Sequence, residues 1–264
     1  DESLLPLPPH FWWLKRLAIA YALLAMIVVG VWFGWDAVAK HRLAAEIARV
    51  RATGEPVSAA DFQGRPQVPD DQNAAKLYIA ASNIKYNAAQ DHIDTLPRRQ
   101  RLTTAEQAAL RSFTSSFAPN LALARKARQL DRADWGKSFS SPLIFINLPS
   151  LNGARHLANT VDYAATAYHM DGDDAETIES VRDVLHQGDM IDADADYLVE
   201  DLVALGIVDM ACGRIREVAG ELAIDAPPAP DGRPLASPHP ATRAQVLGLI
   251  DEFLDERQAN QAIG

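Results

Sequence analysis

The longest run of apolar positions lies near the start of the chain. Residues 17–35 read LAIAYALLAMIVVGVWFGW, nineteen residues without a charge. As a helix, this run is about 28 Å long, close to the roughly 30 Å hydrocarbon core of a bilayer. A buried core helix is rarely apolar on every side over this length, and a signal peptide has a shorter apolar region before a small-residue cleavage site. The bulky ending therefore favours a retained transmembrane helix.

Aromatic and basic residues border this run on both sides. Aromatic rings favour the two membrane–water interfaces, while Lys and Arg can lay their stems along apolar surface and extend their charges into water. The predicted interface anchors are Trp12, Trp13, Lys15, Arg16, Trp32 and Trp35.

Small residues recur on a four-residue spacing within the run, at Ala18, Ala22, Gly30 and Gly34, interrupted by Met26. The last two form a G-x-x-x-G pattern, which lets the backbone of another helix approach closely in lipid. Glycine is also common in membrane helices in general. The pattern predicts a contact with another transmembrane helix, from a second copy or from a different subunit of a membrane complex.

Basic residues give conflicting signals about sidedness. A short N-terminal tail, residues 1–16, places Lys15 and Arg16 against the span, as in a signal anchor. Counting Lys and Arg instead puts the C-terminal side in the cytoplasm. The residues behind that count are Lys40, Arg42, Arg49 and Arg51. Because these four lie in a predicted helix, they can belong to the folded part. We expect the main domain on the extracytoplasmic (periplasmic) side.

Apolar positions at helical spacing continue beyond the membrane run. They predict a juxtamembrane helix over residues 36–53, and the three prolines and two glycines of residues 54–71 predict an extended connector. Thr103 and Glu106 form a capping box, and Pro119 suits the first turn of a helix. The further helices are predicted at residues 71–89, 103–117, 119–130, 150–170, 173–187, 194–222 and 241–261.

Loops and apolar stripes complete this pattern. Residues 131–149 predict a loop with a short apolar piece at 143–146, and the six prolines of residues 225–240 predict a linker before a C-terminal helix within 241–264. The helix at 194–222 has an apolar stripe of Leu198, Leu202, Leu205, Val208, Cys212 and Ile215. The last helix places Val246, Leu249, Ile250 and Phe253 on one face.

Residues 157–189 resemble a single tetratricopeptide-like helix hairpin. The matching positions are Ala165, Tyr168, Gly172 and Asp173. Thr177 and Val184 stand where that family has small alanines, and Asp189 replaces its closing proline. No second copy recurs at a fixed period. The resemblance implies a stacked helical hairpin with an interaction role.

No run alternates in the manner of a strand, so the chain is predicted to be all-α. We expect one transmembrane helix followed by a soluble domain of helical hairpins at residues 72–224, either TPR-like or an irregular α-solenoid. The apolar fraction, 48% of 264 residues, is that of a globular chain with a core.

Charge is distributed unevenly along the chain. The chain has a net charge of −10. Residues 171–201 contain twelve acidic residues and one basic residue, whereas residues 91–137 contain nine basic and five acidic residues. An acidic protein is a poor ligand for nucleic acid, because binding relies on Lys and Arg that neutralise phosphates. The basic segment remains a candidate for a local anionic partner.

Motifs for chemistry are weak or incomplete. One cysteine, Cys212, excludes a disulfide framework and cysteine-rich metal sites. Residues 135–138, WGKS, end like a phosphate-binding loop, but Asp131 stands where that motif needs its first glycine. Seven aspartates could bind calcium or could simply cap helices: Asp171, Asp173, Asp174, Asp189, Asp192, Asp194 and Asp196. No H-E-x-x-H or G-x-S-x-G motif occurs, so we predict no catalytic residue, cofactor or metal site.

Two functions fit these observations. The first is a single-pass, membrane-anchored interaction protein, an accessory or scaffolding subunit of a larger membrane complex, whose partners are the bilayer and another transmembrane helix or subunit. The alternative is a membrane-tethered enzyme, hydrolase-like, with its site in the helical domain. An exposed apolar surface would favour the first, and a polar pocket with convergent His and Asp side chains would favour the second.

Overall fold

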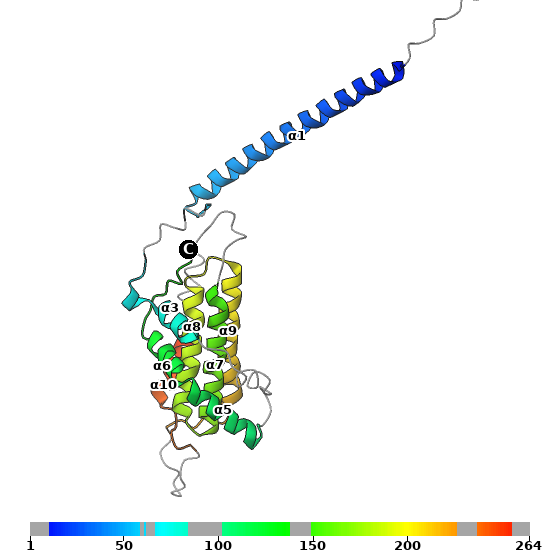
Figure 1. Cartoon of the computed structure of the whole chain (residues 1–264). Coiled ribbons are helices and arrows are strands. Elements are labelled where there is room, and N and C mark those ends of the chain that lie inside the picture. Colours follow the sequence, from blue (N-terminus) through cyan, green and yellow to red (C-terminus); the bar gives the residue numbers. More distant parts are fainter. Residues whose placement is uncertain are drawn as a thin grey trace, which may run out of the picture. The chain divides into compact units, whose positions relative to one another are not determined.

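The computed structural model describes residues 11–58, 61, 67–83, 102–137, 149–225 and 237–254. Within these ranges the chain is helical and contains no β-strand (Figure 1). It divides into two units, residues 1–65 with 139–145 and residues 66–138 with 146–264. The predicted apolar piece at 143–146, most of the proline-rich linker and the end of the last helix lie outside the described residues.

The first unit contains one long helix, α1 (Trp12–Ala52), of 41 residues. It joins the predicted membrane and juxtamembrane helices without a break and ends before Gly54, whose positive φ of 82° stops the helix. None of its residues is buried within the structure. By length and composition, α1 is able to cross a membrane.

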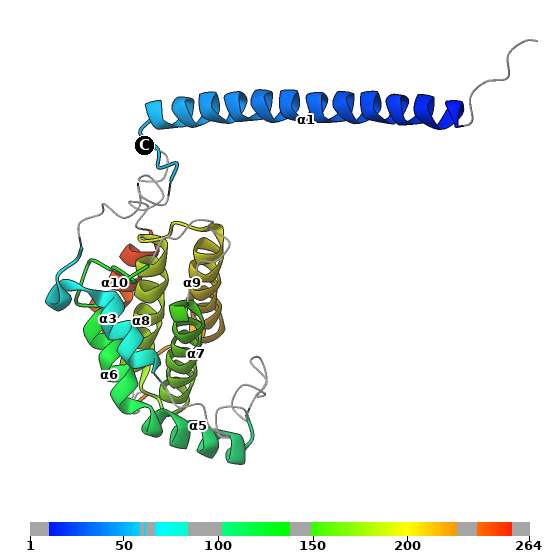
Figure 2. The same cartoon turned by 45° about the horizontal axis from the view of Figure 1, so that its top comes forward.

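The second unit is a helical domain built around three long helices. Its elements are the 3-10 turn η1 (Asp70–Gln72), α3 (Ala74–Ser82), α5 (Thr104–Ser116), α6 (Ala118–Ala127), α7 (Pro149–Met170), α8 (Asp174–Asp192), α9 (Leu198–Val218) and α10 (Arg243–Phe253). Figure 2 shows α7, α8 and α9 side by side, with α3 and α6 next to α8 and α5 across one end of α7.

Local side-chain signals explain most helix starts. Thr103 and Glu106 form the predicted capping box, with the Thr103 N–H donating to Glu106 Oε2 at 2.6 Å. The helix predicted from residue 71 begins later, at Ala74, because the Asn73 side chain accepts a hydrogen bond from the Ala75 N–H at 3.0 Å and caps it. Its described part ends at Ser82.

The core lies between α7, α8 and α9 and extends to α3, α6 and α10. Its largest fully buried apolar side chains include Leu157, Val161, Ile178, Val184 and Ile207. A smaller aromatic cluster lies where α5 crosses α7 and is made of Leu110, Phe113, Phe117 and Tyr163.

The hairpin predicted from residues 157–189 is present as α7 and α8, which turn at Gly172 with a positive φ of 73°. Thr177, at a small-residue position of the tetratricopeptide pattern, is fully buried and donates its hydroxyl hydrogen bond to the Asp173 carbonyl at 2.8 Å. The TPR-like arrangement itself is not confirmed.

Gly188 lies at the closest approach of α8 and α9. A Cβ at this position would lie 2.7 Å from Val208 Cγ2 and 3.3 Å from the Ala204 carbonyl oxygen. The predicted helix ends at Gln187, but Gly188 admits the neighbouring helix and α8 continues to Asp192.

The C-terminal segment packs back onto the domain. The Asp225 N–H donates to the Ala241 carbonyl and the Ala241 N–H donates to the Ala223 carbonyl, each at 2.9 Å. These bonds bring α10 against α8, where Leu249 is buried. Ile250, which we expected on the same face, is 45% exposed.

We predict that Gly188→Ala lowers the free energy of unfolding by about 1–3 kcal/mol, because the added methyl group forces α8 and α9 apart. Gly206→Ala is the matched control, since a Cβ there meets nothing within 4 Å, and it should raise stability by up to about 1 kcal/mol through helix propensity. Chemical unfolding of both full-length variants in detergent micelles measures the difference. Equal stability of the two variants would contradict the close approach.

Candidate functional site

The predicted contact face of the membrane helix lies entirely on α1. Ala18, Ala22, Gly30 and Gly34 are all exposed, and a Cβ at either glycine would meet nothing within 4 Å. No described residue covers this face. A second transmembrane helix against it stays a prediction.

The predicted interface anchors also lie on α1. Trp12 and Arg16 interact at its start, where the guanidinium carbon lies 3.7 Å from the centroid of the indole ring. The other four anchors, Trp13, Lys15, Trp32 and Trp35, are exposed, as are Trp12 and Arg16.

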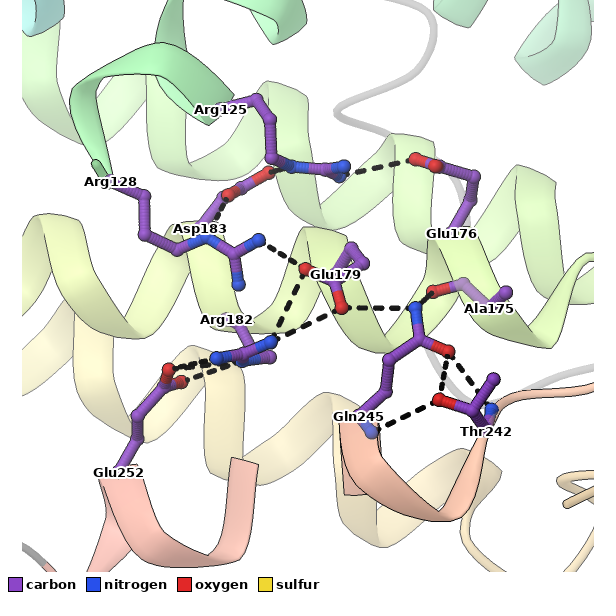
Figure 3. A network of polar contacts seen from close by, with 10 residues as sticks. All are labelled: Arg125, Arg128, Ala175, Glu176, Glu179, Arg182, Asp183, Thr242, Gln245 and Glu252. Atoms are coloured by element: carbon purple, nitrogen blue, oxygen red, sulfur yellow. Dashed lines mark hydrogen bonds and ion pairs between the residues drawn. The ribbon is translucent and has the colours of Figure 1, made fainter. Parts of the chain in front are cut away.

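In the helical domain, a layer of charged residues joins α6 to α8 (Figure 3). Arg125 Nε donates to Asp183 Oδ2 at 2.6 Å, and its Nη2 donates to Glu176 at 3.1 Å. Arg128 pairs with Glu179, and its Nε lies 2.9 Å from Asp183 Oδ1. The basic residues of α6 therefore face the acidic residues of α8.

The same layer continues from α8 to α10 (Figure 3). Arg182 Nε lies 3.0 Å from both carboxylate oxygens of Glu252, and its Nη1 donates to Glu179 at 3.2 Å. Gln245 Nε2 also donates to Glu179, at 3.0 Å. Glu179 thus connects all three helices, and the layer holds α10 in place.

Lys137 is the lysine of the WGKS segment that ends like a phosphate-binding loop. Its side chain is buried among carboxylates. Its Nζ lies 2.7 Å from Asp196 Oδ2, 3.2 Å from Glu200 Oε2 and 3.5 Å from Asp194 Oδ2. These carboxylates neutralise the positive charge of the ammonium group, so this charge is not available to bind a phosphate. Lys137, in the described part of the basic segment, thus has the acidic segment 171–201 of the same chain as its anionic partner.

The aspartates considered as calcium ligands have other partners. Asp173 caps α8, Asp171 pairs with Arg111 at 2.6 Å, and Asp194 Oδ2 accepts from the Trp135 N–H at 3.2 Å. Within the described ranges, no group of three or more His, Cys, Asp or Glu is arranged to hold a metal ion.

Two histidines in the domain make specific contacts. His186 accepts from the Tyr78 hydroxyl at 2.7 Å through Nδ1 and donates from Nε2 to the Leu130 carbonyl at 3.0 Å, and burial lowers its pKa. His169 Nδ1 lies 2.8 Å from Asp174 Oδ1, which resembles a catalytic pair. In a Ser or Cys hydrolase triad, the nucleophile lies beside such a histidine. In the part of the chain that the structure covers, neither histidine contacts one.

The outer side of α9 carries the most distinct surface of the domain. Leu198, Val199, Leu202 and Leu205 are 73%, 47%, 59% and 65% exposed. We call these four residues the leucine face. Three of them belong to the predicted apolar stripe, and their side of α9 faces away from the core, whereas Val208 and Ile215 of the same stripe pack against it.

Two charged residues of α9 explain its orientation. Arg214 is buried and donates to both carboxylate oxygens of Asp162 on α7, at 2.8 and 2.7 Å. Glu200 is buried next to Lys137. Because both side chains point inward, the leucines on the opposite side of the helix point outward. Val208, Cys212 and Ile215, the rest of the predicted stripe, are partly exposed.

Comparisons of the chain with protein-family models, with curated proteins and with solved structures gave no significant match.

We predict that Asp183 makes stability depend on pH. Burial raises the pKa of its carboxyl from 3.8 to about 6, although Arg125 and Arg128 oppose this shift. Between these two values the folded protein binds a proton that the unfolded chain has lost. This group therefore makes the free energy of unfolding fall as the pH rises from about 4 to about 6, by at most about 1.4 kcal/mol per pH unit.

The substitution Asp183→Asn should remove this part of the pH dependence, because an amide does not titrate in that range. Unfolding of the full chain in detergent, followed from about pH 4 to about pH 7, gives the difference between wild type and variant. Asp251→Asn, at an exposed position of α10, is the matched control. A difference between wild type and Asp183→Asn that is constant across this range would contradict the assignment.

Proposed function

We propose that this chain is a single-pass, membrane-anchored interaction protein, an accessory or scaffolding subunit of a larger membrane complex. α1 spans the bilayer, and the helical domain on the extracytoplasmic side presents the leucine face to a protein partner. The face of Ala18, Ala22, Gly30 and Gly34 contacts a second transmembrane helix.

The leucine face is the single observation that carries this proposal. Burying an exposed leucine side chain releases about 1.5–3 kcal/mol, so three leucines on one folded helix can supply much of the free energy of a specific contact. Contiguous exposed apolar surface on a soluble domain is typical of a protein–protein interface. The inward contacts of α9 hold this surface in a fixed orientation, which lowers the entropic cost of binding.

The charged layer supports the same function in a different way. Its residues bind one another across α6, α8 and α10, so they stabilise the domain and are not turned toward a ligand. The catalytic alternative has no comparable observation to favour it among the residues that the structure describes.

Anchoring and sidedness give the first test. Alkaline carbonate should leave the full chain in the membrane fraction, because a spanning helix is not released by loss of surface contacts. A cysteine introduced at exposed Ser112 of α5, in a Cys212→Ser background, should react with a membrane-impermeant maleimide before the inner membrane is opened. Release by carbonate would disprove the anchor, and labelling only after lysis would reverse the sidedness.

The leucine face gives the second test. We expect Leu202→Glu together with Leu205→Glu to reduce the mass of the protein complex extracted in mild detergent, because a buried carboxylate is costly. Leu254→Glu is the matched control, since Leu254 is also exposed, at 70%, but lies beyond α10. Light scattering after size-exclusion chromatography measures the mass. An unchanged mass in the double variant would refute the proposed role of α9.

A further inference from the structure

The part of α1 that follows the apolar span has a regular stripe of its own. Residues 36–52 extend the helix without a break (Figure 2), by about 25 Å. Within this part, alternating steps of four and three residues connect Asp36, Lys40, Leu43, Ile47 and Val50. We call these five residues the α1 seam. An average spacing of 3.5 residues is that of helices packed along a common line in a coiled coil.

The apolar members of the α1 seam need a cover that the described residues do not supply. Leu43 is 62% exposed, Ile47 and Val50 are half-exposed, and no residue of α1 is buried. The opposite side of the same segment carries Arg42 and Arg49. A helix in water with large apolar residues on one side and charges on the other typically packs its apolar side against a neighbour.

Two opposite charges border the α1 seam. Glu46 comes directly before Ile47, and Arg51 comes directly after Val50, so they lie on the two flanks of the seam. Glu46 pairs with Arg49 on its own helix, and Arg51 Nη2 lies 4.0 Å from Asp61 Oδ2. Both side chains nevertheless stay exposed, at 59% and 62%. In a parallel coiled coil, flanking residues five positions apart meet across the two helices and form ion pairs.

We propose that α1 pairs with α1 of a second copy of this chain, in parallel, along the α1 seam. Leu43, Ile47 and Val50 then face the same three residues of the second copy. Glu46 of each copy lies beside Arg51 of the other, so a two-fold axis along the pair creates two ion pairs from one sequence. The surface is complementary to itself, as a two-fold interface requires.

The membrane and the seam residues determine the direction and the number of helices. Copies inserted in the same direction have residues 36–52 on the same side of the bilayer, so their seams can meet only in parallel. A β-branched residue at the position of Ile47 with leucine at the position of Leu43 favours two strands, and a single lysine such as Lys40 fixes the register. Lys40 pairs with Asp36 at 2.8 Å, so the polar end of the seam carries no net charge.

Anchoring compensates for the short length of the seam. An isolated helix of this length is marginal in water, because its first turn is costly to form. In α1 the preceding span supplies the formed helix, and the bilayer confines all copies to one surface, which raises their effective concentration. This inference therefore rests on the proposed function for the anchoring by α1, and it assigns no partner to the leucine face.

The α1 seam and the small residues of the span can bind different helices. The small residues follow steps of four, from Ala18 and Ala22 to Gly30 and Gly34. Steps of four wind around the helix relative to a 3.5-residue seam. Gly34 is thus turned away from the seam, where a transmembrane helix of another subunit can reach it.

Charge reversal in the full chain tests the pairing. In a Cys212→Ser background, which removes the only cysteine, Ala45→Cys on the outward side of α1 carries a donor or an acceptor dye. In phosphatidylcholine vesicles, energy transfer between copies should exceed that of random mixing at the same density. Glu46→Lys and Arg51→Glu should each weaken association about tenfold, because the two-fold axis repeats each change at two pairs, and the double reversal should restore it.

Arg49→Glu is the matched control. It breaks the ion pair of Glu46 on its own helix but lies on the outward side of α1, so it should leave the energy transfer unchanged. Oxidation provides a second measurement that needs no charge change. Single cysteines at Leu43→Cys or Val50→Cys should form a disulfide between two copies, whereas Ala45→Cys should not.

Energy transfer no greater than random mixing would overturn the proposal. So would single reversals that change nothing, a double reversal as weak as the single ones, or a loss in Arg49→Glu equal to that in Arg51→Glu. If transfer stays at the random level while the Leu202→Glu and Leu205→Glu variant still reduces the mass of the extracted complex, the proposed function stands and only the pairing of α1 is rejected.

Discussion

The inward burial of charged side chains on α9 determines what the helical domain presents to its surroundings. Arg214 is held by both oxygens of Asp162, and Glu200 is held by Lys137. Removing one partner of such a buried pair typically costs about 3–5 kcal/mol. Turning α9 to bury its leucines would expose or break both pairs, and it would push large side chains toward Gly188, where α8 leaves no room. The leucines therefore remain outside because the charges and the close helix approach occupy the inside.

The same principle operates between segments that are distant in the sequence. Residues 102–137, the described part of the basic segment, pack against the acidic segment 171–201, where Arg125, Arg128 and Lys137 each pair with an acidic residue. Much of the local charge is thus used to hold α6 and the following loop against α8 and the start of α9.

The accuracy of the sequence predictions follows the range of the interactions involved. The capping box of Thr103 and Glu106 and the uninterrupted helix of α1 depend on neighbours within a few residues, and both were predicted correctly. Predicted helix boundaries were less accurate where a distant residue determines them. Gly188 resembles a helix stop in the sequence, but in the structure it allows α9 to pack closely against α8. Asp194 and Asp196 pair with Lys137, and α9 starts only at Leu198.

The orientation of α9 is not evident from the sequence, and the reason is physical. A stripe of leucines normally marks the core side of a helix, and Arg and Glu normally mark the solvent side. In α9 the inward side uses Ala204, Ala211, Glu200 and Arg214, which no periodicity can recognise as buried without knowledge of Asp162 and Lys137. The opposite charges of the two segments were visible in the sequence, but their individual pairings were not.

The two sides of α9 differ in composition: one side has large apolar residues, and the other has small residues and paired charges. Each side meets a different packing requirement. The inner side of α9 has the small residues and exact charge partners that allow close packing against α7 and α8. The outer side has the large apolar residues that such close packing excludes. Helices with apolar residues on most sides are stable in water only when both sides are covered. The fold covers one side of α9, and the exposed leucines on the other side are the physical reason to expect a second contact that the described residues do not provide.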